Sequence, residues 1–254
     1  MRDDLNSILA NWPYNPDSTV RKILGEDGRE KLQVRVSQGP WDGVLQMEMD
    51  GRPDGRRPHG FDFALDYQKD RLEKHRAARE TDDGFKLDGK ACAELFDEST
   101  KVYGRYVMLL NIQDFERVAR DTERNMEVFR FVNRYAEDED NRMSLEKWWP
   151  YILRINGTAK AMIALKKKDY ERALGIVQET RRRIEDLEEL DAEEFRLERE
   201  RSREGLEAME NSIKQMRGKT ESEILKEQMD EAVAKEEFEQ AAKLRDQLRQ
   251  LRRQ

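Results

Sequence analysis

The sequence predicts a mainly α-helical protein with a small β-hairpin near its N-terminus. Charged residues make up 41% of the 254 residues, yet the net charge is only -7. Only 14 residues are glycine and 6 are proline. From residue 61 onward, apolar residues recur at the three- and four-residue steps of amphipathic helices. This composition is typical of long helices with solvated faces. We expect an array of helical hairpins, then a long charged helix and a C-terminal helical hairpin.

The same composition excludes several protein classes. Hydrophobic residues reach 37% and no run approaches 18 apolar residues, so we expect no membrane span. Asp3 and Asp4 stand where a secretion signal needs basic and then apolar residues, which favours a cytoplasmic protein. Cys92 is the single cysteine and His59 and His75 are the two histidines, so we expect no disulfide framework, metal site or cofactor. The sequence pI near 5.3 is unlike that of a general nucleic-acid binder.

Residues 1–60 form the first region. Asp17 or Ser18, with Gly25 seven or eight residues later, predicts a short helix ending at Leu24. Two runs of alternating apolar and polar residues then predict a pair of strands joined by the Gly- and Pro-containing loop 37–43. The alternating apolar residues are Leu32, Val34 and Val36 in one run and Leu45, Met47 and Met49 in the other.

The segment 50–58 predicts a rigid, irregular loop, because it is rich in glycine and proline. Arg52, Arg56 and Arg57 lie in it, so the loop is a candidate site for a phosphate or carboxylate. The simpler interpretation is a rigid turn with solvated arginines, and it is favoured. An enzyme that uses this loop, with Arg52 and Asp54, is the weakest functional alternative.

Residues 61–180 form the helical-hairpin region, and they contain an internal repeat. Asp114-Phe115-Glu116-Arg117 recurs 55 residues later as Asp169-Tyr170-Glu171-Arg172. Each copy lies between two amphipathic segments, and residues 136–144 supply an insertion between the copies. The pattern resembles the tetratricopeptide helical hairpin, whose usual period is about 34 residues. We expect each aromatic residue to wedge between two antiparallel helices.

Two further features belong to the helical part. Trp148-Trp149-Pro150-Tyr151 favours the buried start of a helix, with Pro150 in its first turn, over a ligand cage. Residues 181–218 carry a narrow apolar stripe in a strongly charged run, which predicts one long helix of coiled-coil or bundle-edge type. Gly218 ends it, and a new helix begins near 221.

Residues 221–254 predict a small helical hairpin with close helix contact at Ala241 and Ala242. The string from Phe238 to Leu248, Phe-Glu-x-Ala-Ala-x-Leu-Arg-Asp-x-Leu, resembles the UvrB/UvrC motif, or UVR domain. The resemblance covers about 30 residues. In that family the motif is an antiparallel helical hairpin that joins protein partners, among them the B and C subunits of the bacterial excinuclease. The resemblance implies Phe238, Ala242 and Leu248 as contact residues, surrounded by the charged Glu239, Arg245 and Asp246.

We therefore expect a non-enzymatic bacterial adaptor that holds protein partners through its UVR hairpin and its repeat region, or that self-associates. The rest of the chain shows no P-loop, helicase motor or nuclease motif, so it does not resemble an excinuclease subunit. The main alternative is an accessory role in nucleotide excision repair, with nucleic acid reached only weakly or through another UVR-bearing protein.

Overall fold

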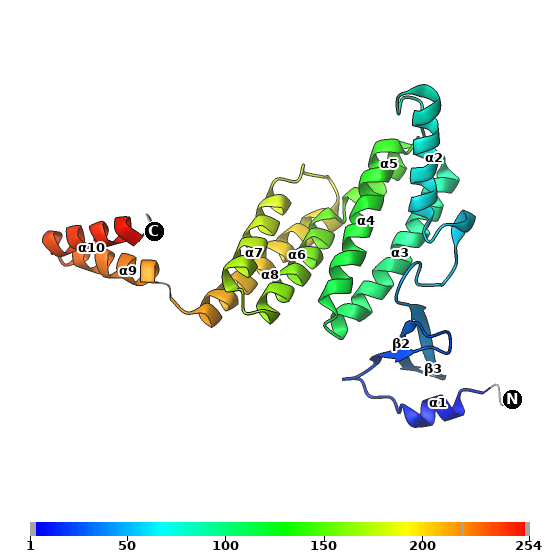
Figure 1. The fold of residues 1–254 in the computed structure, drawn as a ribbon, viewed down its shortest axis with the longest axis horizontal. Helices are drawn as coiled ribbons and strands as arrows, with labels where there is room; N and C mark the ends of the chain where they lie inside the picture. Colours follow the sequence, from blue (N-terminus) through cyan, green and yellow to red (C-terminus); the bar gives the residue numbers. More distant parts are fainter. Residues whose placement is uncertain (1–3, 220, 252–254) are drawn as a thin grey trace.

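The computed structural model describes residues 4–219 and 221–251 of the chain. Figure 1 shows an elongated row of helices with a small sheet near one end and a separate helical hairpin at the other. The predicted mainly α-helical fold is confirmed.

The N-terminal sheet has three antiparallel strands among the described residues, in the order β1-β2-β3. After the short helix α1 (Asn6–Asn11) come β1 (Val20–Leu24), β2 (Glu30–Gln38) and β3 (Trp41–Glu48). The predicted hairpin corresponds to β2 and β3. The helix predicted before Gly25 is wrong, because residues 20–24 pair with β2 in the register Val20↔Val34. Asn15 caps a tight turn there, accepting a hydrogen bond from the Asp17 N–H at 3.0 Å.

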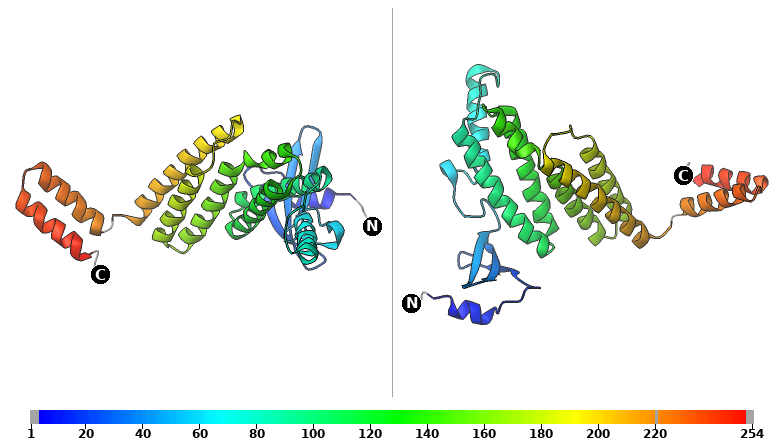
Figure 2. Two further views of the ribbon diagram at one scale, coloured as in Figure 1. Left: turned by 90° about the horizontal axis from the view of Figure 1, so that it is seen from above. Right: turned by 180° about the vertical axis from the view of Figure 1, so that it is seen from behind.

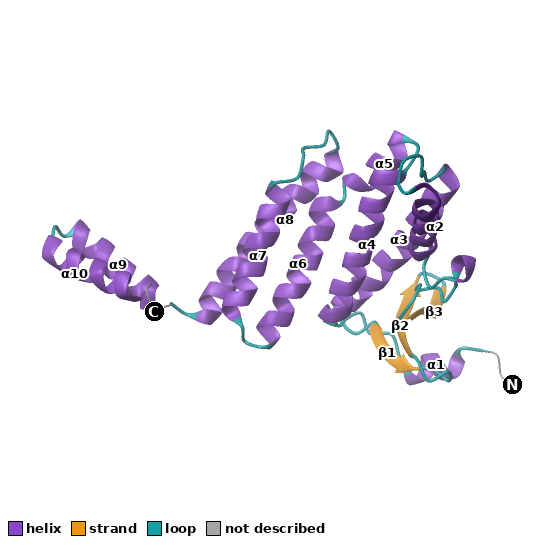
Figure 3. Cartoon of the chain, turned by 45° about the horizontal axis from the view of Figure 1, so that its top comes forward, coloured by secondary structure: helices purple, strands orange, loops and turns teal. Residues whose placement is uncertain are grey.

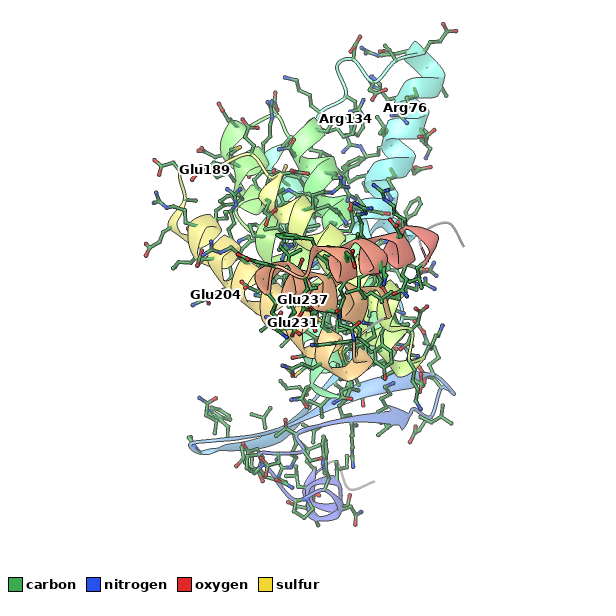
Figure 4. The ribbon with its side chains drawn as sticks, turned by 90° about the vertical axis from the view of Figure 1, so that its left-hand side faces the viewer. Arg76, Arg134, Glu189, Glu204, Glu231 and Glu237 are labelled. Carbon is green, nitrogen blue, oxygen red and sulfur yellow. The ribbon has the colours of Figure 1, made fainter. Side chains whose placement is uncertain are left out.

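The sheet packs against the first long helical hairpin. Loop 49–63, with a 3-10 turn at Pro58–Gly60, leads into α2 (Ala64–Arg79) and α3 (Gly89–Asn111). Leu32 and Met49 from the sheet region share a buried cluster with Tyr106 and Leu109 of α3. At the other end of α2, Arg76 and Arg134 both pair with Asp82, and Figure 4 labels the two arginines.

The middle of the molecule consists of antiparallel helices that lie side by side. They are α4 (Phe115–Tyr135), α5 (Glu139–Glu146), α6 (Trp149–Lys166) and α7 (Tyr170–Glu185). Figures 1 and 3 show that α3 and α4 form one hairpin and α6 and α7 the next, with α5 in the predicted insertion between them. One buried cluster joins α4, α6 and α7 with α8.

The long charged helix starts later than the sequence predicts. α7 runs to Glu185, and α8 (Glu193–Arg217) begins after a loop. The segment 185–194 is rich in acidic residues, which destabilise a helix C-terminus and stabilise a helix N-terminus. α7 therefore ends where this segment begins, at Glu185, and α8 begins near the end of the segment, at Glu193. α8 packs on α6 and α7 at the edge of the bundle.

The C-terminal hairpin consists of α9 (Glu221–Ala234) and α10 (Phe238–Leu251). It follows Gly218, which ends α8 with a positive φ of 77°. Figures 1 and 2 show the hairpin standing apart from the end of α8. Its faces are therefore open to a partner, which makes it the first candidate for a functional site.

Candidate functional site

The C-terminal hairpin is held together by small and branched apolar side chains between its two helices. Ala232 of α9 and Ala241 and Leu248 of α10 are buried, while most of their neighbours are exposed. Alanine at the contact lets the two helix backbones approach closely. About thirty residues make only a marginal core, so the hairpin stands to gain from a further contact.

The turn of the hairpin has a defined geometry. Glu236 adopts a left-handed φ of 59°. The N–H of Glu237 donates to the Ala232 carbonyl at 2.8 Å, and the N–H of Glu236 donates to the Val233 carbonyl at 3.0 Å. These are the two bonds of a Schellman helix ending. The Glu237 carbonyl then accepts the N–H of Ala241 at 3.0 Å, which starts α10 immediately.

The same turn occurs twice more in the described part of the chain, at the sequence repeat. Gln113 and Lys168 have φ values of 56° and 58°. The N–H groups of Asp114 and Asp169 each donate at 3.0 Å to the carbonyl five residues earlier. Their carboxylates cap the next helix by accepting the N–H of Arg117 and Arg172. The predicted repeat is thus a structural repeat.

A further copy of the pattern in the hairpin was missed by the sequence analysis. Glu237-Phe238-Glu239 carries the same order of acid, aromatic and glutamate, with Ala241 in place of Val118 or Ala173. Aligning the chain on this order would have found it.

The aromatic residue of the turn is covered in the inner copies and open in the last one. Phe115 is 6% exposed, and the Lys166 Nζ at the end of α6 lies 4.8 Å from its ring centre. Tyr170 is half-buried, and Arg217 at the end of α8 pairs with the adjacent Glu171 at 2.9 Å. Phe238 is 67% exposed. The aromatic ring of the last turn is therefore exposed, whereas at each inner turn a basic residue from the end of a helix lies beside the turn.

The surroundings of Phe238 are acidic. Glu236, Glu237 and Glu239 are exposed and line a shallow surface hollow with Phe238 and Lys243. Glu237 and Glu231 are labelled in Figure 4 on the hairpin. An apolar ring within a group of carboxylates suits a partner surface that is apolar at its centre and basic at its rim.

The other predicted contact residues have different environments. Ala242 is half-buried, and Arg245 pairs with the adjacent Asp246 at 3.1 Å on the surface. Leu248 is 9% exposed and belongs to the interior of the hairpin. Phe238 and Glu239 thus lie at the open turn, while Leu248 holds the two helices together.

The predicted anion-binding loop is built differently from an open arginine cluster. Arg52 is buried and donates to Asp54 at 2.9 Å and to Asp97 at 3.0 Å, with Glu98 at 3.5 Å. Hydrogen bonding by Arg52 lowers the pKa of Asp54. Arg57 pairs with Asp62 at 3.1 Å, and Arg56 is exposed. Arg52 therefore anchors the loop to α3, and an anion site at Arg56 and Arg57 stays a prediction.

The described residues show neither a metal-binding cluster nor a membrane-spanning helix. Residues 4–219 and 221–251 contain no group of three or more His, Cys, Asp or Glu arranged to hold a metal ion. Within the same ranges, none of the helices is both long and apolar enough to cross a membrane.

Comparison with known proteins addresses only the C-terminal hairpin. No curated protein and no solved structure matches the chain, so its likeness to tetratricopeptide repeats stays a prediction. The family described as UvrB/uvrC motif matches residues 224–254, which include most of α9, the turn at Phe238 and all of α10. The protein therefore carries a UVR domain at its C-terminus.

Proposed function

We propose that this protein is a non-enzymatic adaptor that docks a protein partner on the turn of its UVR hairpin. The observation that carries the proposal is the exposure of Phe238 at a turn whose inner counterpart, Phe115, is buried. Burying one phenylalanine ring at an interface contributes about 1.5–3 kcal/mol, which makes it a natural centre for a small contact.

The inner turns indicate the chemistry of the partner. A basic residue at the end of a helix lies near each of them: Lys166 of α6 lies over the ring of Phe115, and Arg217 of α8 pairs with Glu171 beside Tyr170. Glu236, Glu237 and Glu239 surround Phe238 with negative charge. The partner would therefore present an apolar hollow bordered by Lys or Arg, as the end of a helix does in this chain.

A second candidate function is an accessory role in nucleotide excision repair. It is favoured by the match to the UvrB/uvrC motif, which links the hairpin to repair proteins that interact through it. In that case the partner is another UVR-bearing protein, and nucleic acid is reached only through that partner. The helical-repeat region would hold a second partner in either version of the proposal.

The proposal is tested by comparing two substitutions that each shorten one side chain in the full-length protein. Phe238→Ala removes the exposed ring of the turn, and Leu197→Ala removes an exposed apolar side chain of α8 as a matched control. Both proteins are used as bait in extract from the native host, and the bound proteins are quantified. Docking at the turn is supported if the bound amount of a partner falls at least tenfold with Phe238→Ala but is retained with Leu197→Ala.

Reversing the charge of one acidic residue near Phe238 provides a second test of the proposal. Glu239→Lys should weaken the binding of the same partner and make that binding less sensitive to salt, because the substitution reduces the negative charge around Phe238. If the partner contains a UVR hairpin, the repair-linked version is favoured. If Phe238→Ala and Glu239→Lys retain every partner, docking at this turn is wrong.

A further inference from the structure

A cavity lies in the helical region, far along the chain from the UVR hairpin. Its volume is about 430 Å³, and its wall is formed by α3, α4 and α6, with Leu145 of α5 and Glu198 of α8. This size lies within the range of roughly 300–1,000 Å³ that is typical of small-molecule sites.

Aromatic side chains form half of the described lining residues. They include Trp148 and Tyr151, which belong to the motif Trp148-Trp149-Pro150-Tyr151. Tyr103 and Trp148 are 46% and 37% exposed, so two large rings face solvent at this place. Exposed apolar rings around a hollow mark a binding surface more often than a structural one. The aromatic residues are Phe96, Tyr103, Tyr106, Phe129, Trp148 and Tyr151.

The wall offers little to a charged ligand. Glu198 is the charged residue among the described lining residues, and its two carboxylate oxygens pair with Arg154 at 3.0 Å and Arg201 at 2.7 Å. The ring of Tyr103 packs against those of Tyr106 and Tyr151, with ring centres 5.4 and 6.1 Å apart. Burial raises the pKa of Tyr151 to about 12, so its hydroxyl is protonated at neutral pH. An ionised ligand would lose its hydration without gaining a counter-charge.

One polar atom in the wall lacks a partner. Asn125 is 2% exposed, and its Nδ2 donates to the Ser99 carbonyl at 2.9 Å. A carbonyl only accepts hydrogen bonds, so this contact fixes which end of the amide faces Ser99. The Oδ1 of Asn125 is buried and accepts no hydrogen bond among the described residues. This oxygen has almost no accessible surface, so an occupant of the cavity does not reach it, and the surface offered to a ligand is mainly that of the aromatic rings.

We propose that this cavity binds an uncharged aromatic small molecule of one or two rings. The rings of the ligand pack among the six aromatic side chains of the wall. The proposal is independent of the UVR hairpin, because none of its residues lines this cavity.

The experiment uses indole as the probe and indole-3-carboxylate as an ionised match with the same rings. The full chain is labelled with ¹⁵N, and the side-chain N–H signals of its tryptophans are followed during titration. We expect a saturable shift of the Trp148 signal with indole, while the signals of Trp12 and Trp41 in the N-terminal region stay unchanged. Indole-3-carboxylate should bind at least about tenfold more weakly, because its carboxylate loses hydration without gaining a counter-charge.

Two variants locate the site. Thr100→Trp adds a ring at an exposed position that lines the cavity and should abolish indole binding. Ala93→Trp adds the same ring two turns away on α3, outside the lining, and should leave binding unchanged.

Three outcomes would overturn the proposal. They are the absence of a saturable Trp148 shift, an equal shift of the Trp41 signal, and retention of binding by Thr100→Trp. Equal affinity for indole and indole-3-carboxylate would overturn the uncharged character given to the ligand.

Discussion

Arg105 of α3 and Asp121 of α4 form a two-point ion pair inside the protein. The Arg105 Nε lies 2.6 Å from Asp121 Oδ2, and its Nη2 lies 2.9 Å from Oδ1. The Nη1 of Arg105 donates to the backbone carbonyls of Glu48 and Gly51 at 3.0 and 2.7 Å. One guanidinium therefore fastens the end of the sheet and the start of the following loop to the first helical hairpin.

Removing one partner of this pair should be costly. Asp121→Ala leaves Arg105 as a buried cation without its counter-charge, and we expect the free energy of unfolding to fall by about 3–5 kcal/mol. Arg182→Ala, which breaks a surface pair with Glu179, should cost about 0–1 kcal/mol. Urea unfolding measures both. Equal costs would show that the buried pair does not hold the sheet in place.

The contact between α6 and α7 depends on a residue without a side chain. A Cβ on Gly157 would lie 2.8 Å from Thr180 Cβ and closer still to Thr180 Oγ1. Gly157→Ala should therefore destabilise the protein by about 1–3 kcal/mol, and adding Thr180→Ala should recover part of that loss. Gly175→Ala on α7, where nothing lies within 4 Å, should instead stabilise by about 0.5–1 kcal/mol. Thermal unfolding distinguishes the three proteins, and a stable Gly157→Ala protein would exclude so close a contact.

Asp114 should contribute a measurable part of the acid sensitivity. Burial opposes ionisation, but hydrogen bonds from Lys22 and Arg117 lower the pKa of this carboxyl below its usual 3.8. A carboxylate with a lowered pKa stabilises the folded protein above about pH 4, and this contribution is lost as the pH falls through the folded-state pKa.

Asp114→Asn keeps a helix cap but removes the charge, so stability should decline less steeply between about pH 4 and pH 2. Asp169→Asn makes the same change at the equivalent turn and gives the effect on the cap alone. Urea midpoints across the acid range measure the difference. A decline as steep as that of the unsubstituted protein would assign the acid sensitivity to other groups.

Two large apolar residues of the UVR hairpin should separate binding from stability. Leu248→Ala removes a buried side chain between α9 and α10, and we expect a loss of about 2 kcal/mol or more in the stability of the hairpin. Phe238→Ala removes an exposed ring and should change stability by less than about 0.5 kcal/mol. Amide hydrogen exchange of α9 and α10 reports the difference. A large effect of Phe238→Ala would mean that the ring supports the hairpin itself.

The helices were predictable because their apolar spacing is strong and long. Leu95, Val102 and Leu109 recur at seven-residue steps in α3, and all three are buried. Strand β1 was not predictable in the same way. Asp17, Ser18 and Gly25 are sound local signals for a helix, but pairing with β2 determines the conformation of residues 20–24. Local propensity is a weak guide where a neighbouring strand supplies the hydrogen bonds.

The candidate sites were predictable only in part. The motif around Phe238 was visible because its residues are adjacent in the chain. The cavity at Asn125 was not, since its wall brings together α3, α4 and α6, which are far apart in sequence. Arg52 is an example of a residue whose partners in the fold could not be seen in the sequence. Its place in an arginine-rich loop suggested a free cation, whereas three carboxylates of the folded protein surround it.

The short connection between α8 and the UVR hairpin has a consequence for assembly. Each connecting residue after Gly218 spans at most about 3.6 Å, so a partner on the hairpin is held close to the end of the helical row. A ligand that contacts both parts would meet the second at a high effective concentration, which increases avidity without any additional contact. Lengthening this connection with Gly and Ser residues would thus change the avidity of two-site binding and leave each separate affinity unchanged.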